Sequence, residues 1–479
     1  MRHLGRRRTS HSASASSFSL AACIIALLAE NSPLLISASL SQRTKSERPT
    51  RPFAADIPIS SVYQTDSTQV DVPWGQRRFW NRAWQVATPN VWYLGVTSLL
   101  TDLSSEMVAS VLPMYLVLHL NLSPLAFGTL DGLYNGVSAF TRWASGIVAD
   151  RWRKHKEIAA VGYAISAACR LGLLAAGRAW GGLAVVIAAD RLGKGIRTAP
   201  RDALISLSVP STRLAQSFGV HRALDATGAM LGPIVAFVLL ALVPRGFDVV
   251  FVTSFCVALV GLSVLMLFVE NTAGGNGGSV APEVSLSTVL GLLRERDFRT
   301  VTIAASGLAL VTISDAFLYL VLQERVGFTP GIFPLLYVGT SASYLLLAVP
   351  AGFLADRFGR WRVFLCGHAL LLAIYAWLIV AGGNAASVVL TVVLLGAYYA
   401  ATDGVVVALA SGFVPVTLRG SGFALLTTAT SVSRLVASIA FGWIWTMSGR
   451  ETAIIGFGAA LAVAVTASAV ALRDGNSRD

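Results

Sequence analysis

Charge is the property that this chain has least of. Only 13% of its 479 residues are charged, against roughly 25% in an average soluble protein. Hydrophobic residues make up 54%, and the mean hydropathy is +0.66. The composition therefore excludes an ordinary soluble globular protein and indicates an integral membrane protein embedded in a lipid bilayer.

Cysteines and enzymatic motifs are also scarce. The cysteines stand singly in apolar runs, without a CxxC pair, at Cys23, Cys169, Cys256 and Cys366. That pattern excludes a disulfide framework and a zinc site. The chain has no HExxH and no GxSxG, and "GKG" at Gly193 is no phosphate loop because Gly195 stands where Ser or Thr is needed. We therefore expect no enzyme, no metal and no cofactor.

Long apolar stretches are abundant instead. A helix needs about 20 apolar residues to cross the bilayer. We expect an all-α membrane protein with twelve transmembrane helices, at 90–118, 124–149, 157–178, 180–203, 213–242, 247–269, 299–322, 331–355, 361–381, 385–411, 419–447 and 451–472. The Gly-rich segment 270–298 indicates a cytoplasmic linker with one surface helix. It separates a six-helix bundle over 89–269 from a second over 299–472, and 473–479 form a tail.

The two groups of six spans resemble each other. "GIVADRWRKHK" begins at Gly146 and "GFLADRFGRWR" at Gly352, and "VPSTRLAQSFG" and "VPVTLRGSGFA" recur at nearly the same spacing. Two independent matches indicate an internal repeat. Because six is an even number, both copies have the same orientation, so we expect parallel repeats about an axis along the membrane normal.

Basic residues gather on one side of the spans. Loops on the side of 150–156 carry many more Lys and Arg than the opposite loops, which carry Arg178, Arg245, Arg325 and Arg450. The positive-inside rule places the richer side and both termini in the cytoplasm. We attribute the net charge of +12 to these cytoplasmic loops and the N-terminal segment, and not to a nucleic-acid-binding site. We expect a multi-pass monomer in the bacterial inner membrane.

Residues 1–88 do not follow the transmembrane pattern. They begin rich in Arg and Ser, and their apolar core at 18–28 is too short to span a bilayer. A cleaved secretory signal would start the mature protein outside, against the loop charges. The alternatives are a polar, disordered extension, an upstream start codon that is not used, and an organellar transit peptide.

The repeated "ADR" motif resembles a signature of the major facilitator superfamily of secondary transporters, G-x-x-x-D-R-x-G-R-[RK] between spans 2 and 3. The second copy matches it at Gly352, Asp356, Arg357, Gly359 and Arg360. The first copy has Arg153 in place of the second glycine but keeps Gly146, Asp150, Arg151 and Lys154. The resemblance covers about residues 90–472. It implies twelve helices around a central cavity, and a cytoplasmic gate that these residues hold closed through charge pairs.

Two further motifs bear on the direction of transport. "RLGKG", Arg191 to Gly195, resembles the R-x-x-x-G of span 4 in proton-coupled members. The span 5 motif of exporters is matched, without its final glycine pair, by Gly219, Gly228, Gly232 and Pro233. "TDLSSE" in span 1 and "DRLGKGIRTAPRDA" in span 4 resemble a group of prokaryotic permeases. The resemblance favours proton-coupled export of a small organic solute. Proton symport or facilitated uptake remains an alternative, as does a membrane scaffold or sensor that transports nothing.

Several charges lie deep in the expected spans, where an ionised side chain costs roughly 2.5–3.5 kcal/mol. At about 1.5 Å of rise per residue, Asp102 and Arg191 lie near the midplane, and Asp225 at a comparable depth. Glu106 follows Asp102 on the same face of its helix. We expect these carboxyl groups to bind and release a coupled proton while Arg191 moves toward or away from them. A static salt bridge between helices is the alternative.

The resemblance also implies that spans 1, 4, 7 and 10 line the central cavity. The residues expected to contact the solute are Asp131, Lys194, Asp315, Tyr319, Tyr398 and Asp403. Lower on span 4, Arg197 and Arg201 are expected to extend to lipid headgroups and to pair with Asp190 and Asp202. Pro200 is expected to end or bend that helix.

Overall fold

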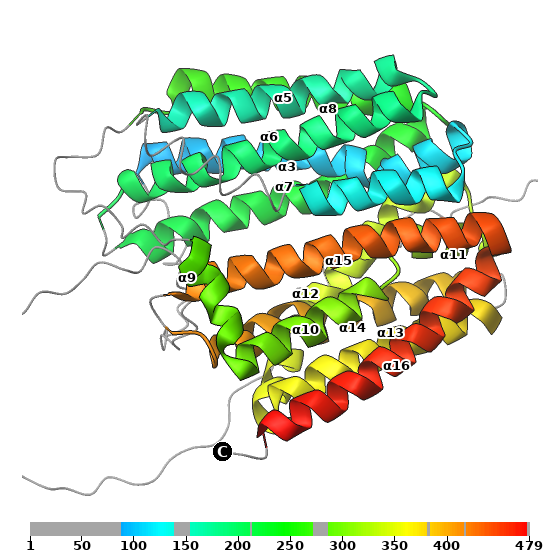
Figure 1. Cartoon of the computed structure of the whole chain (residues 1–479). Coiled ribbons are helices and arrows are strands. Elements are labelled where there is room, and N and C mark those ends of the chain that lie inside the picture. Colours follow the sequence, from blue (N-terminus) through cyan, green and yellow to red (C-terminus); the bar gives the residue numbers. More distant parts are fainter. Residues whose placement is uncertain are drawn as a thin grey trace, which may run out of the picture. The chain divides into compact units, whose positions relative to one another are not determined.

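The computed structural model describes residues 88–137, 154–210, 213–271, 286–380, 384–415 and 418–476. All of them belong to one compact unit within Ile59–Asp479. These residues form helices and short connections and contain no β-strand (Figure 1). Nine helices among them are long and apolar enough to cross a membrane. The expectation of an all-helical membrane protein is confirmed.

The N-terminal half begins with α3, Pro89–Met114, which continues as the π-helical η1, Tyr115–His119. A second helix is described over 124–137. The remaining helices are α5, His155–Ala176; α6, Trp180–Leu207; α7, Leu214–Leu242; and α8, Phe247–Phe268. Pro200 was expected to end or bend the fourth span. The α6 helix continues through this buried residue to Leu207, so Pro200 does not end the helix, and the bend stays a prediction.

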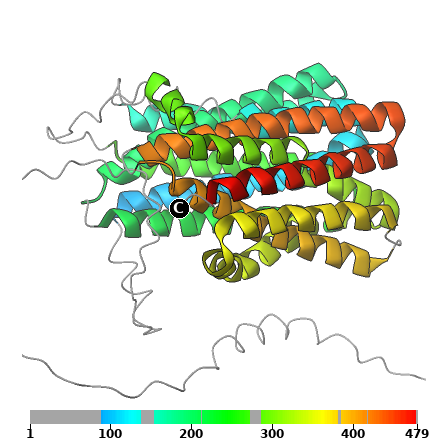
Figure 2. The same ribbon diagram turned by 60° about the horizontal axis from the view of Figure 1, so that its bottom comes forward.

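A short α9, Leu286–Gly291, and the 3₁₀ turn η3, Leu292–Arg294, lead to the C-terminal half. That half consists of α10, Arg296–Leu310; α11, Asp315–Val326; η4, Pro330–Ile332; α12, Phe333–Phe358; α13, Arg360–Val380; α14, Ala385–Ser411; α15, Arg419–Ser448; and α16, Arg450–Asn476. Helices of each half pack mainly on one another, and Figure 2 shows that the long helices of both halves run along a common direction.

The expected seventh span differs from its prediction because it is broken. Residues 311–314 separate α10 from α11, and Ser314 has an extended backbone. The break falls on three consecutive β-branched residues, Val311 to Ile313, whose side chains disfavour helix. The Ile313 backbone N–H, which the break frees, donates to the Tyr375 hydroxyl at 2.7 Å. A polar group inside a membrane needs such a partner.

Candidate functional site

A cavity of about 320 Å³ lies between the two halves. Its walls come from α3, the 124–137 helix and α6 on one side, and from residues 312–316, α12, α14 and α15 on the other. Six of the lining side chains are ionisable acids or bases: Glu106, Asp131, Arg191, Lys194, Asp315 and Arg434. Among the aromatic lining residues are Phe127, Tyr134, Tyr337 and Tyr399. The cavity therefore combines apolar walls with convergent charges, as solute sites in proteins commonly do.

The break in the seventh span places one of these charges. Asp315 is the first residue of α11, so its carboxyl group lies at a helix N-terminus, where the helix dipole favours negative charge. The hydroxyl of Tyr399, on α14, donates to Asp315 Oδ1 at 2.6 Å. Irregular backbone at membrane depth is tolerated where it lines a cavity, and here it orients a carboxylate toward one.

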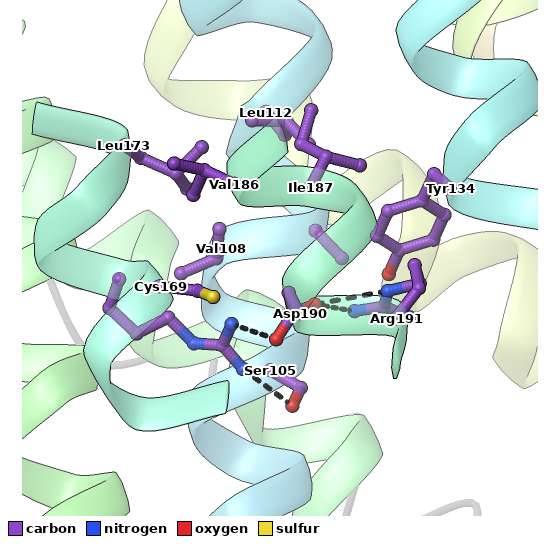
Figure 3. A pocket seen from close by; sticks show the side chains of 12 residues that line it. Ser105, Val108, Leu112, Tyr134, Cys169, Leu173, Val186, Ile187, Asp190 and Arg191 are labelled. Carbon is purple, nitrogen blue, oxygen red and sulfur yellow. Dashed lines mark hydrogen bonds and ion pairs between the residues drawn. The ribbon is translucent and has the colours of Figure 1, made fainter. Parts of the chain in front are cut away.

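Arg191 is held in position by its neighbours. Its Nε donates to Asp190 Oδ2 at 3.0 Å, and its guanidinium lies 3.8 Å above the ring of Tyr134. Figure 3 shows Asp190, Arg191 and Tyr134 in this arrangement. The same Asp190 accepts a hydrogen bond from Arg170 at 2.6 Å through its other oxygen. This ion pair joins Arg170 on α5 to Asp190 on α6.

The Arg170–Asp190–Arg191 cluster is tightly packed. The cavity beside it has a volume of only about 10 Å³. Arg170 Nη2 also donates to Ser105 on α3 at 2.9 Å. The cluster thus ties α5, α6 and α3 together and presents Arg191 to the larger cavity. Arg191 pairs with Asp190 and not with Asp102 or Glu106 in this conformation.

Glu106 and Lys194 are the cavity charges whose side chains have neither an ion pair nor a hydrogen bond among the described residues, whereas Asp131 and Asp315 are hydrogen-bonded to Ser438 and Tyr399. Both are half-buried, and neither takes part in an ion pair among the described residues. Their charges lie near enough to act on each other. Groups that line a cavity without a fixed partner are available to a solute.

A second charged network lies beside the cavity, between α3, α6 and α7. Arg197 Nη2 contacts Asp102 Oδ1 at 3.3 Å, and Arg201 contacts Asp202 at 2.9 Å and Asp225 at 3.6 Å. Arg197 is 2% and Arg201 6% exposed. The prediction that these arginines reach lipid headgroups is therefore wrong, because α3 and α7 supply carboxylates within the bundle. The expected pairing of Arg201 with Asp202 is present.

Two glycines of the span 5 motif bring α7 against α3. A Cβ at Gly228 would lie 2.2 Å from the carbonyl oxygen of Leu99, and one at Gly232 would lie 2.8 Å from that of Leu103. Only glycine permits this approach. Gly219 has open space around it, and Pro233 lies inside α7. Gly228 and Gly232 thus have a packing role in this fold.

The two halves are packed tightly at one end of the helices, here called the closed end. The 124–137 helix begins there and α15 ends there. The Leu125 N–H donates to the Thr446 hydroxyl at 3.0 Å, and a Cβ at Gly128 would lie 2.3 Å from the Ser438 carbonyl oxygen. The Ser438 hydroxyl donates to the Asp131 carboxylate across the same junction.

Toward the other end, charged side chains of both halves are exposed. Arg222 on α7 is 61% exposed and Asp403 on α14 is 50% exposed. Arg434, which lines the cavity between the halves, is 42% exposed and lies 4.0 Å from Asp403. Exposed charges at this depth are costly in lipid, so the exposure of Arg434 indicates that water reaches the cavity from this end. We call this the open end.

Three residues expected to line the cavity lie elsewhere in the described part of the chain. The Tyr319 hydroxyl is bonded to Thr340 at 2.7 Å and is buried. Tyr398 is buried against His368, and Asp403 pairs with Arg434 outside the set of lining residues. Asp131, Lys194 and Asp315 do line the cavity. Tyr337 and Arg434 also line the cavity, although neither was expected from the sequence. The only feature of the sequence that points to Arg434 is a cationic residue inside an expected span.

The gate motif is described in its second copy. Asp356 and Arg360 pair at 3.2 Å, and Arg360 donates to the Ala408 carbonyl at 2.8 Å, which links the α12–α13 junction to α14. Gly359 has a φ of +100°, a conformation open to glycine. Gly352 has open space, and Arg357 lies over Phe358. Gly146, Asp150 and Arg151 lie outside the described residues, and Lys154 precedes α5.

The described residues contain no group of three or more His, Cys, Asp or Glu side chains that could hold a metal ion. Charged side chains from both halves converge on the cavity. They bind ions and polar groups, and they can exchange protons.

The chain matches one family profile over most of its length. A family profile described as the Major Facilitator Superfamily matches residues 94–339 and 302–478. An uncharacterised MFS-type transporter of Methanocaldococcus jannaschii is 29% identical over 377 residues, which cover 77% of this chain and 91% of that protein. An uncharacterised protein of Mycobacterium bovis is 33% identical over 160 residues, which cover 33% and 38%.

Solved transporters share the fold. A mutant of the nucleoside transporter NupG superposes with a TM-score of 0.68 at 15% identity, over 80% of this chain and 99% of that chain. The peptide transporter POT in complex with sulfate gives a TM-score of 0.65 at 14% identity, over 81% and 94%. At such identities the likeness shows the fold alone. With the family profile matching most of the chain, this multi-pass membrane protein belongs to the major facilitator superfamily of transporters.

Proposed function

We propose that this transporter moves a small organic solute by alternating access and couples the movement to protons, in the direction of export by antiport. The observation that carries the proposal is the cavity between the halves, with charges from both halves on its walls. A solute held there contacts both halves at once, so its binding depends on how they are placed.

The charges suggest the kind of solute. Arg191 and Lys194 lie on the wall formed by α6, Asp131 lies on the 124–137 helix of the same half, and Asp315 lies on the opposite side. A volume of about 320 Å³ equals that of roughly ten water molecules at ~30 Å³ each. A small polar or ionisable molecule fits this volume and these charges.

Alternating access is supported by the different state of the two ends. The contacts of Leu125, Gly128 and Asp131 with α15 hold the closed end together. The positive-inside rule assigns the open end to the cytoplasm. Export then requires these contacts to separate after solute has entered from the cytoplasm.

Proton coupling is supported by the carboxyl groups in and beside the cavity. Glu106 faces the solute space, and Asp102 and Asp225 lie behind it. The direction rests on the span 5 glycines alone. Because Gly228 and Gly232 also have a packing role, proton symport or uptake stays the second candidate.

The test is flux in liposomes of purified protein. Compounds that raise its thermal stability are first selected from a panel of cations, anions and zwitterions, and their movement is then followed under an imposed pH gradient. We expect gradient-driven flux, with the Glu106→Gln variant impaired because it loses a charge that faces the solute, and the exposed-site variant Glu157→Gln normal. Flux that ignores the pH gradient for every stabilising compound would contradict proton coupling.

A further inference from the structure

Two carboxyl groups meet where α3 and α7 touch. Gly228 lets the two helix backbones approach, and Asp102 on α3 and Asp225 on α7 enter one charged cluster, because Arg197 and Arg201, one helical turn apart on α6, contact them at 3.3 and 3.6 Å. The two carboxyl groups act on each other there. Their side chains are 14% and 21% exposed. Two carboxylates in contact repel each other, and a pair in such a site favours holding one proton between them.

The neighbours of this pair are mostly arginines. Arg197 on α6 contacts Asp102 at 3.3 Å, and Arg201 on α6 contacts Asp225 at 3.6 Å and Asp202 at 2.9 Å. Arg222 on α7 lies 3.6 Å from Asp225 but is largely exposed. The other ionisable groups that face the pair or its arginines are Lys194 on α6, His221 on α7 and Tyr163 on α5.

Among the side chains of this network that are at most 21% exposed, the charges balance when one proton is present; Arg222, which is 61% exposed and screened by water, is left out of the count. Arg197 and Arg201 bring two positive charges, whereas Asp102, Asp202 and Asp225 bring three negative charges when all are ionised. One bound proton leaves two charges of each sign. Lys194 and Glu106 face the cavity with opposite charges and leave this balance unchanged.

The hydrogen bonds of the network are also incomplete without a proton. Asp225 Oδ1 is buried and has no hydrogen-bond partner among the described residues, since Arg201 lies beyond bonding distance. Arg197, which is 2% exposed, offers Asp102 a single nitrogen, and its Nη1 has no partner in the described part of the chain. Arginine commonly binds a free carboxylate with two nitrogens. A proton shared by the two carboxyl groups would give Asp225 the partner it lacks, whereas Arg197 Nη1 is a donor that lacks an acceptor among the described residues, and a proton does not supply one.

We propose that Asp102 and Asp225 form one proton-binding site that holds a single shared proton, and that this pair, and not Glu106, binds the proton coupled to transport. The inference rests on the proposed function and names the proton site within it. Binding transfers one proton from water to one carboxylate, which then donates a hydrogen bond to the other. Release returns that proton to water and leaves two carboxylates.

The position of the pair connects it to the cavity. Glu106 lies one helical turn beyond Asp102 on α3, and a Cβ at Gly232 of α7 would lie 2.7 Å from the Glu106 Cβ. Repulsion between Asp102 and Asp225 after proton release acts on the same α3–α7 contact. A shift of α3 along α7 therefore moves a cavity side chain.

Infrared difference spectroscopy of the full chain in lipid nanodiscs tests the site, because a protonated carboxyl group has a C=O stretch that a carboxylate lacks. A Glu106→Gln background removes the cavity glutamate from the spectrum. We expect a protonated-carboxyl band at neutral pH that disappears in Asp102→Asn and equally in Asp225→Asn, since each remaining aspartate then pairs with its own arginine. Asp403→Asn, in the opposite half, is the matched control and should keep the band.

Three outcomes would overturn the proposal: no band in the parent protein, a band that survives both substitutions, or a band lost in one variant only, which would assign the proton to a single residue. Size-exclusion profiles confirm that each variant is folded, and an alkaline titration of the parent gives the same band without any substitution at the pair. Failure of the proposed function can be told apart from failure of the shared-proton site. If only the proposed function fails, liposome flux does not depend on the pH gradient while the shared-proton band persists.

Discussion

At the residue scale, the structure gives most buried charges a partner that sequence spacing does not reveal. Asp190 and Asp202 were expected to pair with Arg197 and Arg201, but Asp190 contacts Arg170 and Arg191 instead. Arg170 is twenty positions earlier in the chain, so their contact depends on how α5 packs on α6. Depth along a helix could be predicted, because it follows from rise per residue. The partner of each charge could not, because it depends on helix rotation.

Replacing Asp190 by Asn should destabilise the protein strongly. The change leaves the guanidiniums of Arg170 and Arg191 buried without their shared counter-charge, and breaking a buried pair costs about 3–5 kcal/mol. The free energy of unfolding in mild detergent measures this. The matched control is Asp356→Asn, whose pair with Arg360 is exposed and should change stability by about 0–1 kcal/mol. Equal effects of the two substitutions would refute the role given to Asp190.

Replacing Tyr399 by Phe should weaken solute binding without unfolding the protein. The substitution removes the 2.6 Å hydrogen bond to Asp315, a bond to a charged group worth about 1.5–3 kcal/mol, so a stabilising compound should bind about 10–150-fold more weakly. Calorimetric titration gives the dissociation constant. Tyr319→Phe removes a comparable buried hydroxyl, bonded to Thr340, and should leave binding intact. Unchanged affinity in Tyr399→Phe would show that Asp315 does not contact the solute.

At the element scale, helix existence was predictable and helix continuity was not. Apolar runs of spanning length predicted helices that the structure contains, because hydrocarbon requires satisfied backbone groups. The break between α10 and α11 has only a weak local signal, three β-branched residues. The Ile313 N–H that the break leaves without a helical partner donates to Tyr375 on another helix. No local sequence pattern reveals this contact. Pro200 shows the converse, since packing keeps α6 helical through it.

The junction between the 124–137 helix and α15 should open when Gly128 is replaced by Ala. The added Cβ would lie 2.3 Å from the Ser438 carbonyl oxygen, and such overpacking costs about 1–3 kcal/mol, which corresponds to roughly 5–150-fold more opening. Hydrogen–deuterium exchange at 124–130 measures it. Gly219→Ala, with open space around the added methyl, is the control. Equal exchange in both variants would mean that this junction does not hold the closed end.

At the scale of the whole molecule, the internal repeat predicted two similar halves, and the family match agrees with it. The cavity between them could be anticipated only through the family resemblance, because its walls come from helices of both halves. Which expected residues reach it depends on how the halves are tilted. Thus Asp315 lines the cavity and Tyr319, one turn along the same helix, does not.

The central claim is that solute crosses by separation and closure of the two halves, and one cross-link tests it directly. The Leu125 backbone N lies 3.0 Å from the Thr446 hydroxyl across the closed end, so cysteines at these two positions should form a disulfide. Flux of a stabilising compound is measured in liposomes before oxidation, after it and after reduction, with a Thr446→Cys single variant as control. We predict that oxidation stops flux in the double variant alone and that reduction restores it; full flux through the cross-linked protein would contradict alternating access.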